Sequence, residues 1–401
     1  MKYLVILADG MADEPLDILD GKTPMEYAKT PTMDRLACKS TMGTVKTVPA
    51  GMKLGSDVAN LAVLGYDPVN NYSGRSSLEA LSVGVPMAQT DIIYRANLVT
   101  LTEEELFEQK TIVDHSSGEI STEDADILMD AVRAAFNNET FEFYTGTSYR
   151  HIMVWHKGDK LDLSQPHDHL GCVVKEFLPS QPELLAMMKQ SYEILNNHPL
   201  NLERAANGKR KANCLWFWGA GTKPTLQSFQ EKTGLKGAMI SAVDLLKGIA
   251  VGAKMQVINV SGANGGLYTN YEGKAKAAVK TLLEDGNDFV YVHVEAPDEM
   301  GHSGNAHNKV LSIENVDSKI VKIIQDDLDN AGVPYRMLIL PDHPTPIRIR
   351  THTGNPVPFL LYDSTHPQKK KAFFSEKEGE TADVFVAEGY KLIDMLISNH
   401  I

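Results

Sequence analysis

The stretch FVYVHVEAPDEMGH occupies residues 289–302 and joins a strand pattern to an acid and an imidazole. Its first part, Phe289–Val294, is a short apolar run rich in valine, which predicts a strand buried on both faces. Asp298 and His302 follow four positions apart, so a helix would place them one turn apart on the same face. In open α/β sheets, functional residues gather just past the carboxyl ends of the strands. The stretch therefore predicts an α/β fold with a site at that edge of the sheet.

Runs of the same kind recur along the chain and alternate with helical patterns. The other predicted strands are Lys2–Ala8, Met255–Val260, Arg336–Leu340 and Val357–Tyr362. The predicted helices are Met33–Ser40, Ser56–Leu64, Tyr271–Glu284, Asn308–Ala331 and Thr381–Ser398. Strands that alternate with helices of this length indicate βαβ units and a mostly parallel sheet flanked by helices.

Other predicted strands are flanked by residues of the same two kinds. Asp9 comes at the end of the first predicted strand. Asp342 and His343 follow the predicted strand Arg336–Leu340, and His352 lies just before the last predicted strand. Taken singly, each residue has an ordinary structural explanation, such as a turn or a helix cap. Together with the acid and imidazole above, they place three carboxylates and three imidazoles at one edge. This donor set suits Mn²⁺, Zn²⁺ or Mg²⁺ and predicts a site for divalent cations.

Ser56 is the candidate nucleophile. It follows Gly55 and begins a helical pattern, so its hydroxyl is expected at a helix N-terminus, where free N–H groups and the helix dipole favour a phosphate. Serine is also a preferred N-cap residue, so a structural role and a catalytic role both agree with the local sequence. A metal ion bound to the hydroxyl would lower its pKa and make it a nucleophile at neutral pH.

The length of 401 residues favours two domains. From about residue 89 to residue 207 the sequence is more polar and carries a cluster of acids, Glu103–Glu105. The segment 201–211 is polar and basic and resembles a linker. We therefore predict that residues 89–207 form a smaller inserted α+β domain, and that residues 1–88 and 208–401 together form the metal-binding catalytic domain.

The composition excludes several classes of protein. The formal net charge of −13, with no basic stripe or patch, argues against nucleic-acid binding. No apolar run reaches the ~18 residues that a membrane span needs. The three cysteines, Cys38, Cys172 and Cys214, lie far apart and favour reduced side chains in a cytoplasmic protein. If an acidic chain binds anionic phosphates, something local must reverse the electric field at the binding site, and metal ions are the simplest means. The oligomeric state is left open.

Taken together, these motifs resemble the cofactor-independent phosphoglycerate mutases of the alkaline-phosphatase superfamily, most closely their archaeal-type branch. The motifs that carry the resemblance are Asp9-Gly10, Gly55-Ser56-Asp57, Pro297-Asp298 through His302, Pro341-Asp342-His343 and Thr351-His352-Thr353. Ser56–Tyr66 with Gly74-Arg75, and then Ser148-Tyr149-Arg150-His151, extend the resemblance into the inserted region. The resemblance covers nearly the whole chain. It implies an alkaline-phosphatase-like domain interrupted by a substrate-handling domain.

The resemblance also implies metal ligands and a reaction. The residues that would hold one ion are Asp298, His302 and His352, and those that would hold the second are Asp9, Ser56, Asp342 and His343. Ser56 would take the phosphoryl group of 3-phosphoglycerate as a phosphoserine and return it to the other hydroxyl, which gives 2-phosphoglycerate in glycolysis and gluconeogenesis. Mn²⁺ is the expected ion, with Zn²⁺ or Mg²⁺ as alternatives, and the expected partner is a small phosphorylated metabolite.

The substrate carboxylate favours guanidinium partners, because arginine binds carboxylates in a bidentate manner. The candidate substrate-binding residues are Arg75, Arg95, His115, Arg150, His151 and Lys247. The arginines would bind the carboxylate, the histidines would move protons between the glycerate hydroxyls, and the lysine would lie near the phosphate. The run His167-Asp168-His169 is left out of the metal sites, because a polar loop explains it equally well.

Two positions depart from the archaeal-type pattern. Ser76-Ser77 stand where that pattern usually has Gly-Pro, and Glu119 stands where a basic residue is usual. Both changes touch the substrate end and leave the metal motifs intact. A branch of proteins that resemble this sequence is proposed to act as homoserine kinases. The resemblance therefore leaves an alternative function, a homoserine kinase-like phosphotransferase or a phosphatase acting on another small alcohol. A third hypothesis is that the chain is a catalytically silent relative that binds metal or metabolites. This hypothesis ranks last, because every expected ligand is present.

Overall fold

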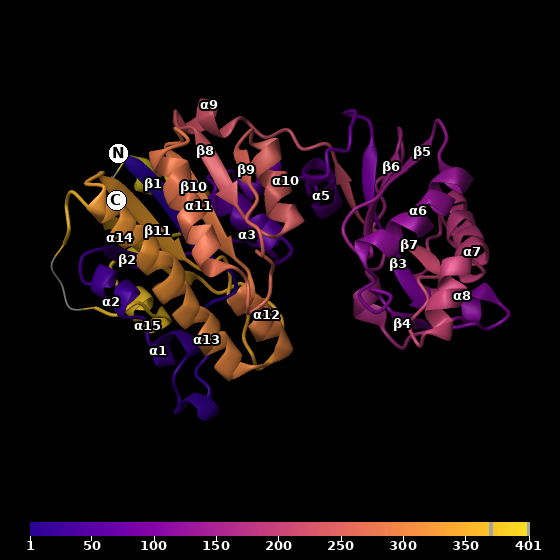
Figure 1. Cartoon of the computed structure of the whole chain (residues 1–401), viewed down its shortest axis with the longest axis horizontal. Helices are drawn as coiled ribbons and strands as arrows, with labels where there is room; N and C mark the ends of the chain where they lie inside the picture. The colour runs from indigo at the N-terminus through magenta and orange to yellow at the C-terminus, as the bar shows by residue number, and fades with distance from the viewer. Residues whose placement is uncertain (369–371, 399–401) are drawn as a thin grey trace. The chain divides into compact units, whose positions relative to one another are not determined.

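The computed structural model describes residues 1–368 and 372–398, and the chain divides into two compact units, each with its own sheet (Figure 1). The first unit is Met1–Tyr72 with Thr225–Ile401, and the second is Ser73–Pro224. The first unit is thus built from both ends of the chain, and the second from a continuous segment between them. Within the described residues, no helix is long and apolar enough to cross a membrane.

The first unit contains an eight-stranded sheet. In spatial order its strands are β13 (Val384–Val386), β2 (Thr41–Val45), β12 (Val357–Asp363), β11 (Tyr335–Leu340), β1 (Lys2–Ala8), β10 (Phe289–Val294), β8 (Gly237–Ile240) and β9 (Gln256–Ile258). β12 is antiparallel to both of its neighbours, and the other described pairs are parallel. The predicted α/β fold with a mostly parallel sheet is confirmed.

Helices cover this sheet on both faces, which is why β10 and β12 are buried along their whole length. The helices of the first unit are α1 (Pro24–Tyr27), α2 (Pro31–Ala37), α3 (Ser56–Val63), α4 (Pro68–Asn71), α9 (Phe229–Thr233), α10 (Asp244–Gly252), α11 (Tyr271–Leu283), α12 (Ala296–Ser303), α13 (Ala306–Val316), α14 (Lys322–Asn330), α15 (Glu376–Glu380) and α16 (Leu392–Ser398). α11 packs on β10 and β8, α10 packs on β8 and β9, and α16 packs on β11.

The C-terminal part of the first unit differs from its prediction. The predicted helix Thr381–Ser398 is wrong over its first half, where β13 pairs in parallel with β2 at the edge of the sheet. The pairing depends on Gly43 of β2, because a Cβ there would lie 2.2 Å from the carbonyl oxygen of Val384. Only the second half of the predicted range is helical, as α16. A strand that forms through a distant partner leaves little signal in its own three residues.

The second unit contains an antiparallel sheet covered by helices. Its strands are β3 (Ile92–Leu101), β4 (Ile112–Asp114), β5 (Phe141–Tyr144), β6 (Arg150–Trp155) and β7 (Cys214–Thr222), and its helices are α5 (Arg75–Ser82), α6 (Thr122–Phe136), α7 (Pro182–Asn196) and α8 (Pro199–Ala206). The ten-residue strand β3 pairs with β4, β6 and β7. A continuous core lies between this sheet and the helices α6 and α7.

The second unit is longer at both ends than the predicted inserted segment 89–207. α5 precedes that segment and packs on β3 and β7, and β7 follows it and pairs with β3 over most of its length. The C-terminal limit of the second unit could not be placed from sequence, because β7 belongs to this unit only through its pairing with β3, which lies more than a hundred residues earlier. The substrate-handling role of the inserted part stays a prediction.

Candidate active site

The predicted metal ligands of the first unit gather at one edge of its sheet. Asp9 directly follows β1, and Asp342 and His343 follow the parallel strand β11 after Pro341. Asp298 lies in α12, which begins two residues after β10. His352 precedes β12, and because β12 runs antiparallel to β11, the residues before it lie at the same edge. Strand direction therefore brings together residues that are more than 300 positions apart.

The first group of side chains able to hold a metal ion is Asp9, Asp342 and His343, all buried, with ligand atoms within 4.8 Å of one another. His343 Nε2 lies 3.6 Å from Asp9 Oδ1 and 3.3 Å from Asp342 Oδ2. Ser56 Oγ lies 3.1 Å from the same nitrogen. Asp9 Oδ1 is buried and has no hydrogen-bond partner among the described residues. A buried acceptor left in this state fits a cation that would neutralise it.

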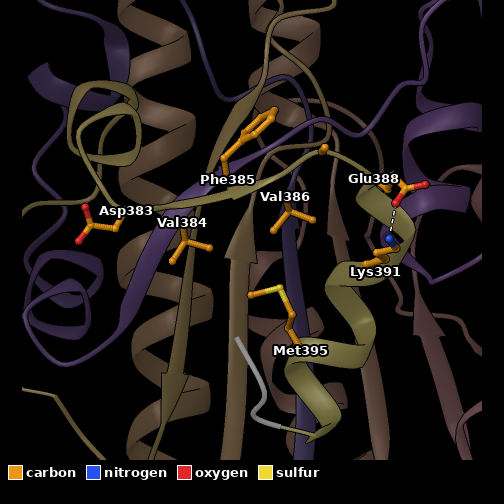
Figure 2. Close-up of a pocket in the computed structure, with 8 residues that line it drawn as sticks. Asp383, Val384, Phe385, Val386, Glu388, Lys391 and Met395 are labelled. Atoms are coloured by element: carbon orange, nitrogen blue, oxygen red, sulfur yellow. Dashed lines mark ion pairs between the residues drawn. The ribbon is translucent and has the colours of Figure 1, made fainter.

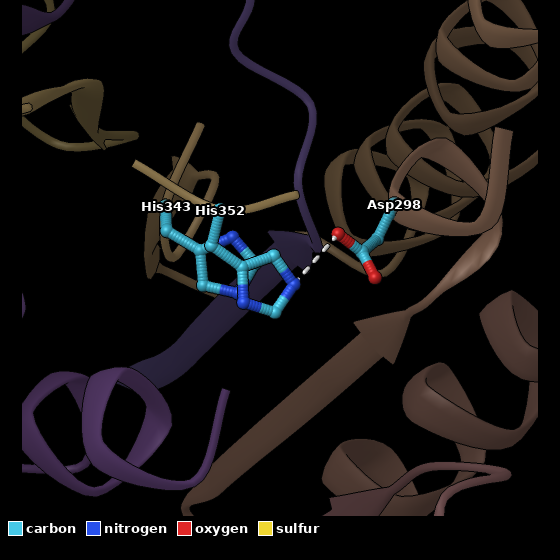
Figure 3. A group of neighbouring side chains, drawn as sticks. All are labelled: Asp298, His343 and His352. Carbon is cyan, nitrogen blue, oxygen red and sulfur yellow. Dashed lines mark ion pairs between the residues drawn. The ribbon is translucent and has the colours of Figure 1, made fainter. Parts of the chain in front are cut away.

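The second group is Asp298, His343 and His352 (Figure 3). His352 Nε2 lies 3.5 Å from Asp298 Oδ1, and the rings of His343 and His352 stack with their centroids 3.9 Å apart. His302 adjoins the group, with its Nε2 3.2 Å from Asp298 Oδ2 and 3.0 Å from His352 Nε2. His343 thus belongs by geometry to both groups, and the two candidate cation positions share one imidazole.

Burial and mutual repulsion set the charges of these acids. Burial, together with the negative charges of Asp342 and Asp298, holds the pKa of Asp9 well above its ordinary value. Burial acts to raise the pKa of Asp298 as well, but hydrogen bonds from His302 and His352 outweigh it and hold this pKa well below its ordinary value. The bond to Asp298 also raises the pKa of His302 to about 9. Such a concentration of negative charge in a buried site suits divalent cations.

Backbone and amide donors orient Asp342. Its Oδ1 accepts the N–H of Gly10 at 3.1 Å and the N–H of His343 at 2.9 Å, and its Oδ2 accepts the side-chain amide of Asn60 at 2.9 Å. Gly10 has φ +61°, and a Cβ there would lie 2.5 Å from Asp298 Oδ1. Only glycine fits at this position, which explains the Asp-Gly pair after β1.

His293 is a buried neighbour of the site that sequence reasoning missed. Its Nε2 lies 2.9 Å from Asp9 Oδ2 and its Nδ1 lies 3.1 Å from Ser241 Oγ. Burial lowers the pKa of His293 to about 3, so the ring is neutral. Ser241 Oγ accepts the N–H of Val243, so its own hydrogen can go to Nδ1, which leaves the Nε2–H for Asp9. The available signal was an imidazole in the middle of an otherwise apolar strand.

Ser56 is the first residue of α3, and Gly55 is its N-cap. Ser56 is therefore not the N-cap, so the structural explanation that the sequence allowed for it does not apply, and Asp57 Oδ1 accepts the N–H of Val58 in the first turn at 3.0 Å. The Ser56 hydroxyl instead contacts His343, and α3 begins beside the first group of candidate metal ligands. This arrangement places the hydroxyl beside both the candidate cation site and the free N–H groups of a helix N-terminus.

The second unit brings together some of the predicted substrate residues. Glu79 Oε1 lies 3.0 Å from Arg75 Nε and 3.1 Å from Arg95 Nη2. Burial lowers the pKa of Arg95 to about 10, although Glu79 opposes this shift. The Arg150 guanidinium lies 4.3 Å from the centre of the Tyr149 ring. In the β3–β6 ladder, Arg150 pairs with Asn97, two positions from Arg95, so both arginines lie on one face of the sheet.

His115 joins this group. Its ring meets the edge of the Tyr149 ring at a centroid distance of 5.6 Å, and its Nδ1 is buried with no hydrogen-bond partner among the described residues. His167, which the sequence reasoning set aside, lies 6.0 Å from the His115 ring and 5.4 Å from the Trp218 ring. The loop that carries His167 therefore contributes to the same polar, aromatic surroundings.

Two predicted substrate residues are placed elsewhere. His151 follows Arg150 along β6 and therefore points to the opposite face of the sheet, where it is fully buried and accepts the N–H of Gly146 at 3.2 Å. Burial lowers its pKa to about 3. Lys247 lies in α10 of the first unit and pairs with Asp244 at 3.5 Å. The expected pairing of His151 with His115 as proton carriers is thus not supported by this geometry.

A surface cavity of about 470 Å³ lies at a different place, between β13 and α16 (Figure 2). Val384, Val386 and Met395 line it, and Glu388 and Lys391 form an ion pair beside it. None of the candidate ligands contributes to its lining. The cavity is therefore separate from the two groups of candidate metal ligands.

Comparison with known proteins identifies the family. The family model described as 2,3-bisphosphoglycerate-independent phosphoglycerate mutase matches residues 37–201. A relative from Geobacter sulfurreducens, described as a probable enzyme of this name, is 45% identical over 99% of this chain and 100% of its own length. A relative of the same name from Methanosarcina barkeri is 45% identical over 99% of both chains. The chain belongs to this family. The predicted family and enzyme class are confirmed.

Two solved structures show the same fold. The PH0037 protein from Pyrococcus horikoshii has a TM-score of 0.80 at 30% identity and covers 99% of this chain and 96% of its own. A cofactor-independent phosphoglycerate mutase from Thermoplasma acidophilum has a TM-score of 0.64 at 26% identity over 100% of both chains. The relatives named here do not favour the homoserine kinase alternative.

Proposed function

We propose that this enzyme interconverts 3-phosphoglycerate and 2-phosphoglycerate by moving the phosphoryl group onto Ser56 and back. One observation carries the proposal: Ser56 Oγ lies 3.1 Å from His343 Nε2, and His343 is shared by both groups of candidate metal ligands. The hydroxyl that would accept the phosphoryl group is thus beside the place where positive charge would be concentrated. The names of the relatives support the choice of phosphoglycerate as the substrate.

The residues present fit two divalent ions, with Mn²⁺ as the first choice and Zn²⁺ or Mg²⁺ as alternatives. The proposed ligands are Asp9, Ser56, Asp342 and His343 for one ion and Asp298, His302 and His352 for the other. When bound, two such ions would lower the pKa of the serine hydroxyl and neutralise charge on the transferred phosphoryl group. The unpartnered Asp9 Oδ1 and the mixed Asp and His donor set support this assignment.

The remaining tasks fall to the chain's own residues. Ser56 attacks the phosphoryl group in line, and the N–H groups at the start of α3 bind its oxygens. Arg75, Arg95 and Arg150 bind the substrate carboxylate, and His115 moves a proton between the glycerate hydroxyls. Glycerate reorients without leaving, and its other hydroxyl takes the phosphoryl group back. Lys247 as a phosphate neighbour and a cytoplasmic location remain predictions from the sequence.

The test is Ser56→Ala, compared with wild type and with Ser318→Ala, which removes an exposed hydroxyl from another helix. A coupled assay with Mn²⁺ and no added bisphosphoglycerate should show turnover by wild type and by the control. Ser56→Ala should lose at least about 10³-fold in turnover, because the step that forms the phosphoserine lacks its nucleophile. Mass spectrometry of quenched wild type should find phosphate on Ser56. Undiminished turnover by Ser56→Ala would reject the mechanism.

A further inference from the structure

Thr345 is a fully buried residue in the loop that follows β11, two positions after His343. Its hydroxyl donates to Asp298 Oδ1 and lies 3.3 Å from His343 Nδ1. A single hydroxyl therefore contacts one candidate ligand carried by α12 and another carried by the loop after β11. None of the motifs recognised in the sequence included it.

The hydrogen-bond directions follow from the chemistry of the three groups. Thr345 has one hydroxyl hydrogen, and the carboxylate of Asp298 is an acceptor only, so the hydrogen goes to Asp298. The hydroxyl oxygen is then left to accept from the Nδ1–H of His343. In a neutral His343 ring the hydrogen is therefore on Nδ1, and Nε2 carries no hydrogen and has a free lone pair. Nε2 is the atom that faces Ser56 Oγ, Asp9 and Asp342.

The backbone of Thr345 is fixed by a buried lysine. Lys309 Nζ, from α13, donates to the carbonyl oxygens of Thr345 at 2.9 Å and Ala12 at 3.2 Å, and pairs with Asp13 Oδ2 at 2.7 Å. Lys309 is fully buried, and its three N–H groups meet three acceptors. The N–H of Thr345 also donates to the carbonyl oxygen of Ala12 at 3.1 Å. The loops after β1 and β11 are thus tied to α13 at this residue.

Two glycines allow this close packing around Thr345. A Cβ at Gly10 would lie 2.5 Å from Thr345 Oγ1, and a Cβ at Gly301 would lie 2.6 Å from the Thr345 carbonyl oxygen. Any side chain at either position would displace the hydroxyl or the backbone of Thr345. The surroundings therefore hold the hydroxyl in one place between Asp298 and His343.

We propose that Thr345 is a positioning residue that orients Asp298 and His343 for divalent cations and sets the ring tautomer of His343. The inference rests on the proposed metal centre. Partners that orient ligands commonly contribute about 10–100-fold to metal affinity. Because His343 belongs to both candidate groups, loss of the hydroxyl should weaken both cation positions.

The experiment measures Mn²⁺ binding to the full chain, by equilibrium dialysis and by the electron paramagnetic resonance signal of free Mn²⁺. Thr345→Val removes the hydroxyl and keeps the shape, and Thr345→Ser keeps the hydroxyl. We expect Thr345→Val to bind Mn²⁺ about 10–100-fold more weakly than wild type. Thr345→Ser should bind Mn²⁺ with an affinity close to that of wild type. Thr281→Val, a buried threonine of α11, controls for the substitution itself and should bind as wild type does.

Circular dichroism and melting in chelator separate positioning from folding. If Thr345→Val does not fold, Thr345→Ala, which also lacks the hydroxyl and is smaller, carries the same expectation. Wild-type Mn²⁺ affinity in a folded Val or Ala variant would overturn the proposal, even if its melting temperature falls. Equal loss in Thr345→Ser would overturn it as well. A wild-type chain that binds no divalent ion would instead reject the metal centre of the proposed function.

Discussion

At the scale of one residue, Asp9 shows that the candidate metal site contains a buried acid that destabilises the folded state when it is ionised. It is 2% exposed, His293 donates to one of its oxygens, and the other has no hydrogen-bond partner among the described residues. Burial and the nearby Asp342 and Asp298 hold its pKa well above the ordinary value of 3.8. A carboxyl with a raised pKa in the folded state favours folding when protonated, and this contribution is lost as the pH rises through the raised pKa.

Asp9→Asn should therefore stabilise the chelated protein. We expect its melting temperature in chelator to exceed that of wild type by a few degrees at pH 8. The difference should shrink as the pH falls, because the raised pKa lets wild-type Asp9 take up a proton in the folded state. Added Mn²⁺ should raise the melting temperature of wild type and much less that of Asp9→Asn. Scanning calorimetry checks both, with the exposed Asp17→Asn as control. A lower melting temperature for Asp9→Asn in chelator would contradict this account.

At the scale of elements, one long helical run supports the sheet and also caps another helix. The predicted helix Asn308–Ala331 is continuous in the structure from α13 to α14, but residues Asp317–Val321 between them form a π-helical turn. Asp317 accepts the N–H groups of Met33 at 2.6 Å and Thr32 at 3.2 Å. These are first-turn donors of α2, and the side chain of its N-cap residue, Thr30, makes no capping hydrogen bond. The π-helical turn thus places a carboxylate at the N-terminus of α2.

Asp317→Ala should destabilise the fold, because it leaves two buried N–H groups without an acceptor and removes a negative charge from a helix N-terminus. The expected loss is about 1–3 kcal/mol in the free energy of unfolding. Asp317→Asn keeps one carbonyl acceptor and should lose less. Urea unfolding of the three proteins checks the order. Equal stability of Asp317→Ala and wild type would show that the cap contributes nothing measurable.

At the scale of the whole molecule, the two units carry different groups of candidate functional residues. The proposed cation ligands and Ser56 belong to the first unit, and the grouped arginines belong to the second. A ligand stabilises the structure that binds it, by about 2.7 kcal/mol when its concentration is 100 times its dissociation constant. Cation binding should therefore protect the first unit directly.

Hydrogen exchange followed by mass spectrometry tests this division. Adding Mn²⁺ to the chelated protein should slow exchange by up to about 100-fold in peptides that cover 9–13, 298–303 and 342–353. Peptides from the second sheet, covering 92–101 and 150–155, should exchange at the same rate with and without the ion. Protection that appears first in the second sheet would contradict the placement of the cations.

Much of the fold could be predicted because its signals are local. The bounds of β1 and β10 were predicted from their apolar runs, and α11 was predicted to within a residue. The strands β2, β8 and β13 were missed, since each is short and forms through its partner rather than its own pattern. The limits of the second unit were missed for a related reason, because β7 belongs to it only through its ladder with β3.

The sequence by itself determined the family, the residue types of the candidate ligands and the edge of the sheet at which they lie, because strand patterns and the residues that follow them are adjacent in the chain. Only the tertiary structure decided that His343 is shared by two groups, that His293 and Thr345 orient their neighbours, and that His151 faces away from the arginines. These facts depend on strand order, strand direction and side-chain alternation across distant segments. Distances of 3–4 Å between residues hundreds of positions apart arise from packing, which no local pattern records.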